Sequence, residues 1–139
     1  MENNILEMTI ARVCKPGEEN KNGKTYDMQS YKIAIDKFMQ KINNQRIPIY
    51  SEYISDNYTS FTSSERMQTI KLENSLGRIT EVTDEYITLE IKEDNGIYQL
   101  LKENNLLNRL TAGMRYMGNC TQGNAYSVDE IITFDVFVR

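Results

Sequence analysis

The side chains of this sequence that could catalyse a reaction are carboxylates and hydroxyls, because the chain contains no histidine. That absence excludes catalysis by a nucleophile and histidine pair, and it excludes every metal site that needs an imidazole ligand. The candidate nucleophiles Ser51, Ser63 and Ser64 lie in a polar segment without the glycine elbow that exposes a catalytic serine in hydrolases. The sequence therefore gives no support to nucleophilic catalysis.

Carboxylates remain as candidate acid and base groups, since glycosidases work with a pair of them. The candidates are Asp84, Glu85, Glu90, Asp129, Glu130 and Asp135. Each lies in an expected turn or at a strand position that we expect to face solvent, so we interpret all of them as surface charge. An enzyme that uses carboxylates alone is the alternative.

The sequence predicts no cofactor site and no metal site. Gly23-Lys24-Thr25 is similar to the end of a phosphate-binding loop, but the upstream glycine at the required spacing is missing and no apolar strand precedes it. Cys14 and Cys120 are far apart and lack the paired spacing of a zinc site, so we interpret them as packed free thiols.

Length and charge narrow the classes of protein to consider. A chain of 139 residues can bury a core without disulfides, so we expect a single β-rich domain over residues 1–139. A net charge of −4 argues against a nucleic-acid partner, because that affinity comes from Lys and Arg neutralising phosphates. No stretch approaches the roughly 20 apolar residues of a membrane span, and we expect no membrane partner.

The stretch from Ser75 to Lys92 predicts a β-hairpin with its turn at Thr83-Asp84-Glu85. Its second half alternates apolar and polar residues, and successive side chains on a strand point to opposite faces. We therefore expect Ile87, Leu89 and Ile91 to face the core, and Thr88, Glu90 and Lys92 to face water.

Further strands are predicted before this hairpin. Residues 5–13 carry apolar side chains on both faces, which is typical of a strand at the centre of a sheet. Alternation predicts a second strand over residues 26–35, antiparallel to the first. Residues 36–43 fit either a continuing strand or one helical turn that places Phe38 and Ile42 inward, and we favour the strand.

The main helix is predicted over about residues 96–108, where Ile97, Leu100, Leu101 and Leu107 share one face. Strands are predicted over residues 111–118 and along the carboxyl-terminal segment SVDEIITFDVFVR. The fold class is therefore mainly β, of α+β type: a small open β-barrel or sandwich with one main helix packed on it.

A polar segment at about residues 51–64 is rich in Ser, Thr, Asn and Asp but also carries Tyr53, Tyr58 and Phe61. Polar loops of this length are usually functional or disordered, and disordered segments are generally poor in aromatic residues. We predict that these three aromatic residues bind a partner. The alternative is that Tyr58 and Phe61 fold back onto the domain. Thr62 and Glu65 fit a capping box that opens a short helix.

The order of these parts resembles that of the prohead maturation proteases of tailed bacteriophages, whose small barrel is shared with herpesvirus assemblin. In that family a strand ends in the catalytic histidine, an Ile-Gly-Arg-type turn leads into a hairpin, a helix follows, and a glycine-flanked serine strand precedes a closing strand. The matching segments here are residues 46–53, LGRITEV at 76–82, 97–107, 112–118 and 130–138, of which LGRITEV is the most specific.

The chain departs from the family at both catalytic positions. It has Ser51-Glu52-Tyr53 where the family has histidine, and Met114-Arg115-Tyr116 where the family has the nucleophilic serine. The resemblance therefore implies the scaffold without the protease. It leads us to expect a noncatalytic viral structural protein, an auxiliary or decoration component of the virion. Its expected partner is the major capsid protein or another virion protein, bound in multiple copies after synthesis in the host cytoplasm. The alternative is a small β-rich adaptor of a phage tail, neck or other assembly.

Overall fold

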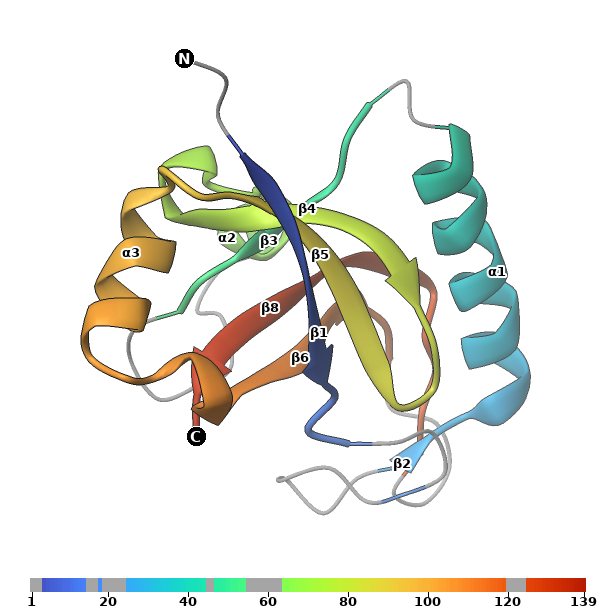
Figure 1. Cartoon of the computed structure of the whole chain (residues 1–139). Coiled ribbons are helices and arrows are strands. Elements are labelled where there is room, and N and C mark those ends of the chain that lie inside the picture. Colours follow the sequence, from blue (N-terminus) through green and yellow to red (C-terminus); the bar gives the residue numbers. More distant parts are fainter. Residues whose placement is uncertain (1–3, 15–17, 19–24, 45–46, 55–63, 120–124) are drawn as a thin grey trace.

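The computed structural model describes residues 4–14, 18, 25–44, 47–54, 64–119 and 125–139. These residues form an α+β fold with two packed antiparallel sheets, flanked by α1 and α3 on opposite sides (Figure 1). In chain order the elements are β1 (Ile5–Ala11), β2 (Thr25–Tyr26), α1 (Met28–Asn44), β3 (Tyr50–Glu52), α2 (Ser64–Gln68), the 3-10 helix η1 (Leu72–Asn74), β4 (Ser75–Val82), β5 (Tyr86–Lys92), α3 (Gly96–Glu103), the 3-10 helix η2 (Leu107–Arg109), β6 (Leu110–Met117), β7 (Ala125–Tyr126) and β8 (Glu130–Val138).

The predicted hairpin is confirmed as β4 and β5, at the centre of a four-stranded sheet of order β1-β5-β4-β3. Ile87, Leu89 and Ile91 are fully buried, as expected. The Thr83 hydroxyl closes the turn by accepting a hydrogen bond from the Tyr86 backbone N–H at 3.1 Å. The expectation that Thr88 faces water was wrong, because β5 has a neighbour on each side and Thr88 is buried between them.

Strand β1 is confirmed, but the prediction that it lies at the centre of a sheet was wrong. Among the described strands it pairs with β5 alone, so it forms an edge of the four-stranded sheet. Only one face of β1 packs against the core, through Leu6, Met8 and Ile10, whereas Ile5 on the other face is exposed. Apolar side chains at both odd and even positions of residues 5–13 suggested burial on both faces of the strand, but Ile5 lies at the surface.

The second sheet consists of β6 and β8 and packs across the four-stranded sheet. At one edge Arg12, just after β1, forms a single bridge with Ala112 of β6, and at the other Tyr53 bridges Val136 of β8. Side chains reinforce this second junction, since the Ser51 hydroxyl donates to the Phe134 carbonyl at 2.7 Å. The sheets thus touch at both edges without continuous ladders, and they are open rather than closed into a barrel.

The prediction of strands over residues 26–35 and 36–43 was wrong, because helix α1 occupies most of this region. Its buried residues, Tyr31, Ala34, Phe38 and Ile42, recur every three or four positions, which is the helical period. The Asp27 carboxylate accepts a hydrogen bond from the Ser30 backbone N–H at 3.0 Å and caps the first turn. The apparent strand alternation was a coincidence of composition, and Ile33, which it placed in the core, is exposed.

The helix predicted over about residues 96–108 is confirmed as α3, but it is shorter than expected, and α1 rather than α3 is the longest helix among the described residues. Helix α3 ends at Glu103, and Leu107 belongs to the separate 3-10 helix η2. Asn95 caps it by accepting a hydrogen bond from the Tyr98 backbone N–H. Leu101 is buried, whereas Leu100, expected on the same buried face, is exposed.

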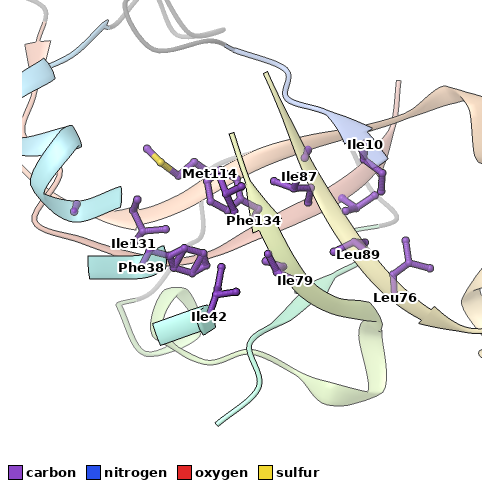
Figure 2. Packing of buried hydrophobic residues seen from close by; sticks show 14 of the residues in the cluster. Ile10, Phe38, Ile42, Leu76, Ile79, Ile87, Leu89, Met114, Ile131 and Phe134 are labelled. Carbon is purple, nitrogen blue, oxygen red and sulfur yellow. The ribbon is translucent and has the colours of Figure 1, made fainter. Parts of the chain in front are cut away.

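The core lies between the two sheets and under α1 (Figure 2). Phe38 of α1 packs against Phe134 of β8 with their ring centroids 5.6 Å apart. Ile79 and Leu89, from neighbouring strands of the larger sheet, pair in register and complete this layer. Among the described helices, none has the length and apolar character needed to cross a membrane.

Candidate functional site

Three charged side chains from distant parts of the sequence meet inside the protein. Arg115 of β6 lies between Glu52, at the end of β3, and Asp135 of β8, and the side chains of all three are fully buried. The Arg115 Nη2 atom is 2.8 Å from Glu52 Oε2 and 2.6 Å from Asp135 Oδ1. Arg66 of α2 pairs with Glu52 from the outer side. We refer to Glu52, Arg66, Arg115 and Asp135 as the ion cluster.

Every hydrogen-bond donor of Arg115 is used. A guanidinium group has five N–H donors in a fixed planar fork. Here Nε donates to Asp135 Oδ2 at 2.9 Å, and Nη2 donates to both carboxylates. Nη1 donates to the backbone carbonyls of Thr69 at 2.9 Å and Met67 at 3.4 Å. The guanidinium group of Arg115 therefore joins β8, β3 and the end of α2 with the residue that follows it.

Glu52 is similarly saturated. Its carboxylate accepts hydrogen bonds from both Nη atoms of Arg66 and from Nη2 of Arg115. It also accepts from the Lys71 backbone N–H at 3.2 Å and from Asn74 Nδ2 at 3.1 Å. Four of these five bonds come from residues 66–74, so Glu52 holds that segment against the sheets.

The two buried carboxylates differ in acidity. Burial alone would raise the pKa of Glu52, but the hydrogen bonds from Arg66, Arg115, Asn74 and the Lys71 N–H outweigh it and lower the pKa to about 2. Burial raises the pKa of Asp135 to about 6, because the bonds from Arg115 only partly offset the loss of hydration. Glu52 is therefore the firmly ionised member of the pair.

The interpretation of Asp135 as solvated surface charge was wrong. Phe134 and Val136 of β8 face the core, so Asp135 points to the opposite face, where we expected water. That face is also covered, because Arg115 and the chain at residues 67–69 lie over it. The other candidate carboxylates fit the expectation better. Asp84, Glu85, Asp129 and Glu130 are exposed, and Glu90 is half-buried in an ion pair with Arg78.

The predicted partner-binding residues are only partly described by the structure. Tyr53 is half-buried, its ring packs against the core, and its backbone N–H donates to the Asn74 carbonyl at 2.7 Å. Tyr58 and Phe61 lie outside the described residues, as do Thr62 and Ser63. The short helix expected beyond them is present as α2. Ser51 is fully buried with its hydroxyl bonded to a backbone carbonyl, which is not the setting of an exposed nucleophile.

A surface pocket of about 320 Å³ lies on the outer face of the four-stranded sheet. Tyr50, Arg78 and Glu90 line it side by side on β3, β4 and β5, and the exposed side chains of Ile5 and Leu72 form part of its rim. The Arg78 and Glu90 side chains bind each other at 3.0 Å. The pocket therefore offers apolar surface and an existing ion pair, without a nucleophile and base in contact.

The geometry of the ion cluster suits a structural role better than a chemical one. A general base needs a lone pair that can reach a substrate proton. The oxygens of Glu52 instead receive several bonds each inside the protein. No group of three or more His, Cys, Asp or Glu side chains that could hold a metal ion occurs within the described part of the chain.

Comparison of the chain with protein-family models, curated proteins and solved structures finds no match. The signal for the ion cluster was nevertheless present in the sequence. Arg115 and Asp135 each interrupt an apolar strand segment, and charged residues inside buried strands are usually paired. The partner Glu52 could not be found in this way, because it lies in a short strand within a polar stretch.

Proposed function

We propose that this protein is a noncatalytic structural component of a tailed-phage virion, an auxiliary or decoration protein that binds the capsid shell. The proposal combines the resemblance to prohead maturation proteases with the geometry of the ion cluster. In that family the histidine and the serine must meet to act, although they come from distant strands. This chain has Ser51-Glu52-Tyr53 and Met114-Arg115-Tyr116 in the two corresponding places, and Glu52 and Arg115 are the middle residues of these segments.

The observation that carries the proposal is the contact between these two residues. They are 63 positions apart in the sequence, and their side chains are 2.8 Å apart in the fold. A shared scaffold accounts for that contact, because it would bring the same two strand positions together. The contact itself is an ion pair with its hydrogen-bonding capacity used internally, which supports a scaffold that has lost the protease chemistry.

The proposed partner surface is the aromatic set Tyr53, Tyr58 and Phe61. Tyrosine and phenylalanine are common anchors of protein interfaces, because they give large contact area with little loss of side-chain entropy. The Tyr53 ring is partly committed to the protein's own core. We therefore expect Tyr58 and Phe61 to contribute most of the affinity, with the major capsid protein as partner.

Co-sedimentation with capsid shells tests this function. Purified protein is mixed with shells assembled from the major capsid protein of the same genome, and bound protein is measured across a concentration series. We expect saturable binding, weakened by about 2 kcal/mol or more in the Tyr58→Ala and Phe61→Ala double variant, since truncated interface anchors cost about that much. The unfolding midpoint of the free variant should stay nearly unchanged.

Two outcomes would contradict this account. Absence of saturable binding to shells, with binding to purified tail or neck proteins instead, would replace the capsid with the adaptor alternative. Loss of stability in the double variant with intact shell binding would assign the two rings to the protein's own interior.

A further inference from the structure

Strand β1 is an exposed sheet edge whose backbone groups are arranged to accept another strand. Arg12 donates its backbone N–H to the Glu85 carbonyl, and the Asn4 carbonyl accepts from Glu93, so even-numbered residues bond across the ladder to β5. Backbone groups of successive residues in an antiparallel pair point to opposite sides. The N–H and C=O groups of Ile5, Glu7 and Thr9 therefore point away from β5, and no other described strand pairs with them.

This edge lacks the usual protection. Natural proteins blunt sheet edges with bulges, prolines or inward-pointing charges, because a regular edge is a template for another chain. The ladder between β1 and β5 runs without a register shift from Ile5 to Ala11, whereas the other ladders of the two larger sheets each contain one. The opposite edge of the same sheet, at β3, is joined to β8 through Tyr53. The carboxyl-terminal end of β1 is joined to β6 in a similar way, because Arg12 bridges Ala112 and the Thr111 hydroxyl donates to the Ala11 carbonyl at 3.1 Å. The open part of the β1 edge therefore runs from Ile5 to Thr9.

The side chains along β1 indicate which strand would fit. Leu6 and Met8 pack against the core but are only partly buried, so an apolar residue of an added strand would cover them. On the outer face the exposed Glu7 lies directly opposite Glu90 of β5. Glu90 already binds Arg78, whereas no ion pair is found for Glu7 within the described residues. A cation on the added strand would complement the Glu7 carboxylate.

We propose that the β1 edge binds an extended segment of a partner protein, with alternating apolar residues over Leu6 and Met8 and a basic side chain beside Glu7. Only a polypeptide backbone supplies N–H and C=O groups at the two-residue spacing of Ile5, Glu7 and Thr9. Strand β1 is a different segment of the chain from the aromatic set Tyr53, Tyr58 and Phe61. The inference does not depend on whether the protein binds a capsid.

Peptide titration followed by NMR tests this inference. The isotope-labelled protein is titrated with the acetylated and amidated octapeptide SVTVKVTS, with its glutamate analogue SVTVEVTS, and with the proline analogue SVPPKPPS. We expect saturable changes in the amide signals of Ile5, Glu7 and Thr9 with the lysine peptide. The glutamate analogue should bind about two- to five-fold more weakly, since an exposed charge pair contributes about that much. The proline analogue should not bind, because its four prolines remove the N–H donors that would face β1 on either side of the lysine, whether the added strand runs antiparallel or parallel to β1.

Two variants separate the contributions of charge and backbone. Glu7→Lys should reverse the preference, so that the glutamate peptide binds more tightly than the lysine peptide. Thr9→Pro removes a donor that points away from β5, so it should abolish binding while the spectrum stays that of the folded protein. Lys37→Glu, an exposed change on α1, should leave both affinities unchanged.

Three results would overturn the inference. One is the absence of saturable changes along β1, and another is a peptide preference that Glu7→Lys does not alter. The third comes from analytical ultracentrifugation of the protein alone. A concentration-dependent dimer that Thr9→Pro abolishes would assign this edge to a second copy of the chain.

Discussion

Two arginine side chains are buried in the part of the chain that the structure describes, and their surroundings differ in kind. Arg115 is 1% exposed, and carboxylates and carbonyls accept all five of its N–H donors. Arg12 is 7% exposed and has no carboxylate partner in the described structure. Its Nη1 atom donates to the Tyr31 hydroxyl at 2.8 Å and to the Thr83 carbonyl at 2.9 Å, while Nη2 has no hydrogen-bond partner among the described residues.

The two environments show two ways of keeping a cation out of water. Arg115 is neutralised by opposite charge within a saturated network. Arg12 lies over aromatic rings instead, with its guanidinium carbon 4.9 Å from the Phe134 ring centroid and 5.7 Å from that of Tyr31. Removal of Arg115 leaves Asp135 buried without a cation and leaves Glu52 with Arg66 alone, whereas removal of Arg12 leaves the neutral groups that it contacts. The stability of the fold should therefore depend far more on Arg115.

The largest effect is expected for Arg115→Met. Loss of one partner of a buried ion pair usually costs about 3–5 kcal/mol, because the opposite charge stays buried and uncompensated. Glu52 and Asp135 would both lose hydrogen bonds, and the chain at residues 67–69 would lose its anchor. Chemical denaturation measures the change, with Arg78→Met at a half-exposed pair as the control. A loss below about 1 kcal/mol would contradict a central structural role for the ion cluster.

The acid stability of the protein should depend on Glu52. Its folded-state pKa of about 2 lies below its ordinary value of 4.5, so Glu52 stabilises the fold above pH 4.5 and loses this contribution as the pH falls toward 2. Asp135 acts in the opposite sense, because its pKa is raised from 3.8 to about 6 and its protonation between those values favours the folded state.

Unfolding free energies measured from pH 7 to pH 2 should show both contributions. The wild-type protein should lose stability below pH 4.5, and Glu52→Gln should remove that dependence at the cost of lower stability at pH 7. Asp135→Asn should remove the gain between pH 6 and pH 3.8. If Glu52→Gln leaves the fall in unfolding free energy below pH 4.5 unchanged, Glu52 is not the group responsible for it.

A smaller effect is expected for Arg12→Met. The variant loses a contact with two rings and two hydrogen bonds to neutral groups, but it also removes the unpaired Nη2 donor, and the methionine side chain fills part of the space. We expect destabilisation of about 1–2 kcal/mol. Denaturation alongside Arg115→Met gives the ratio of the two effects, and an equal loss for both would show that the two buried arginines do not differ in their contribution to stability.

The smallest effect on stability is expected for an ion pair at the protein surface. Lys41 of α1 lies 3.7 Å from Glu130, and both side chains are 54% exposed. Lys41→Ala should change the unfolding free energy by no more than about 0.5 kcal/mol, because exposed pairs are screened and gain little over hydration. Thermal unfolding at low and high salt checks this, and a strong salt dependence would show that this pair matters more than its exposure suggests.

The periodicity of apolar residues in the sequence predicted the strands and helices that have one buried face and one polar face. The hairpin β4–β5 and helix α3 were found because one face of each is buried and the other polar. Helix α1 was missed because Tyr31, Ile33 and Ile35 also alternate at strand spacing, and only the longer repeat through Phe38 and Ile42 reveals the helical period. Periodicity could not place β1 at an edge, since pairing order depends on contacts between distant strands.

The ion cluster illustrates a second limit of sequence patterns. Asp135 was interpreted as a surface residue because one face of β8 was expected to be exposed to solvent. The cover on that face comes from residues 66–74, a segment with few apolar residues that Arg115 and Glu52 hold through hydrogen bonds. Contacts between polar groups leave no hydrophobic period in the sequence, so they become visible only in the folded chain.

Intact-mass spectrometry of the protein incubated with shells of unprocessed major capsid protein tests whether the protein has protease activity. We propose that an ion pair with its hydrogen-bonding capacity used internally takes the place of the histidine and the serine of the prohead maturation proteases. This proposal predicts that the masses of both proteins stay unchanged over prolonged incubation, at any ratio of the two. Specific cleavage that increases with the dose of this protein would contradict it.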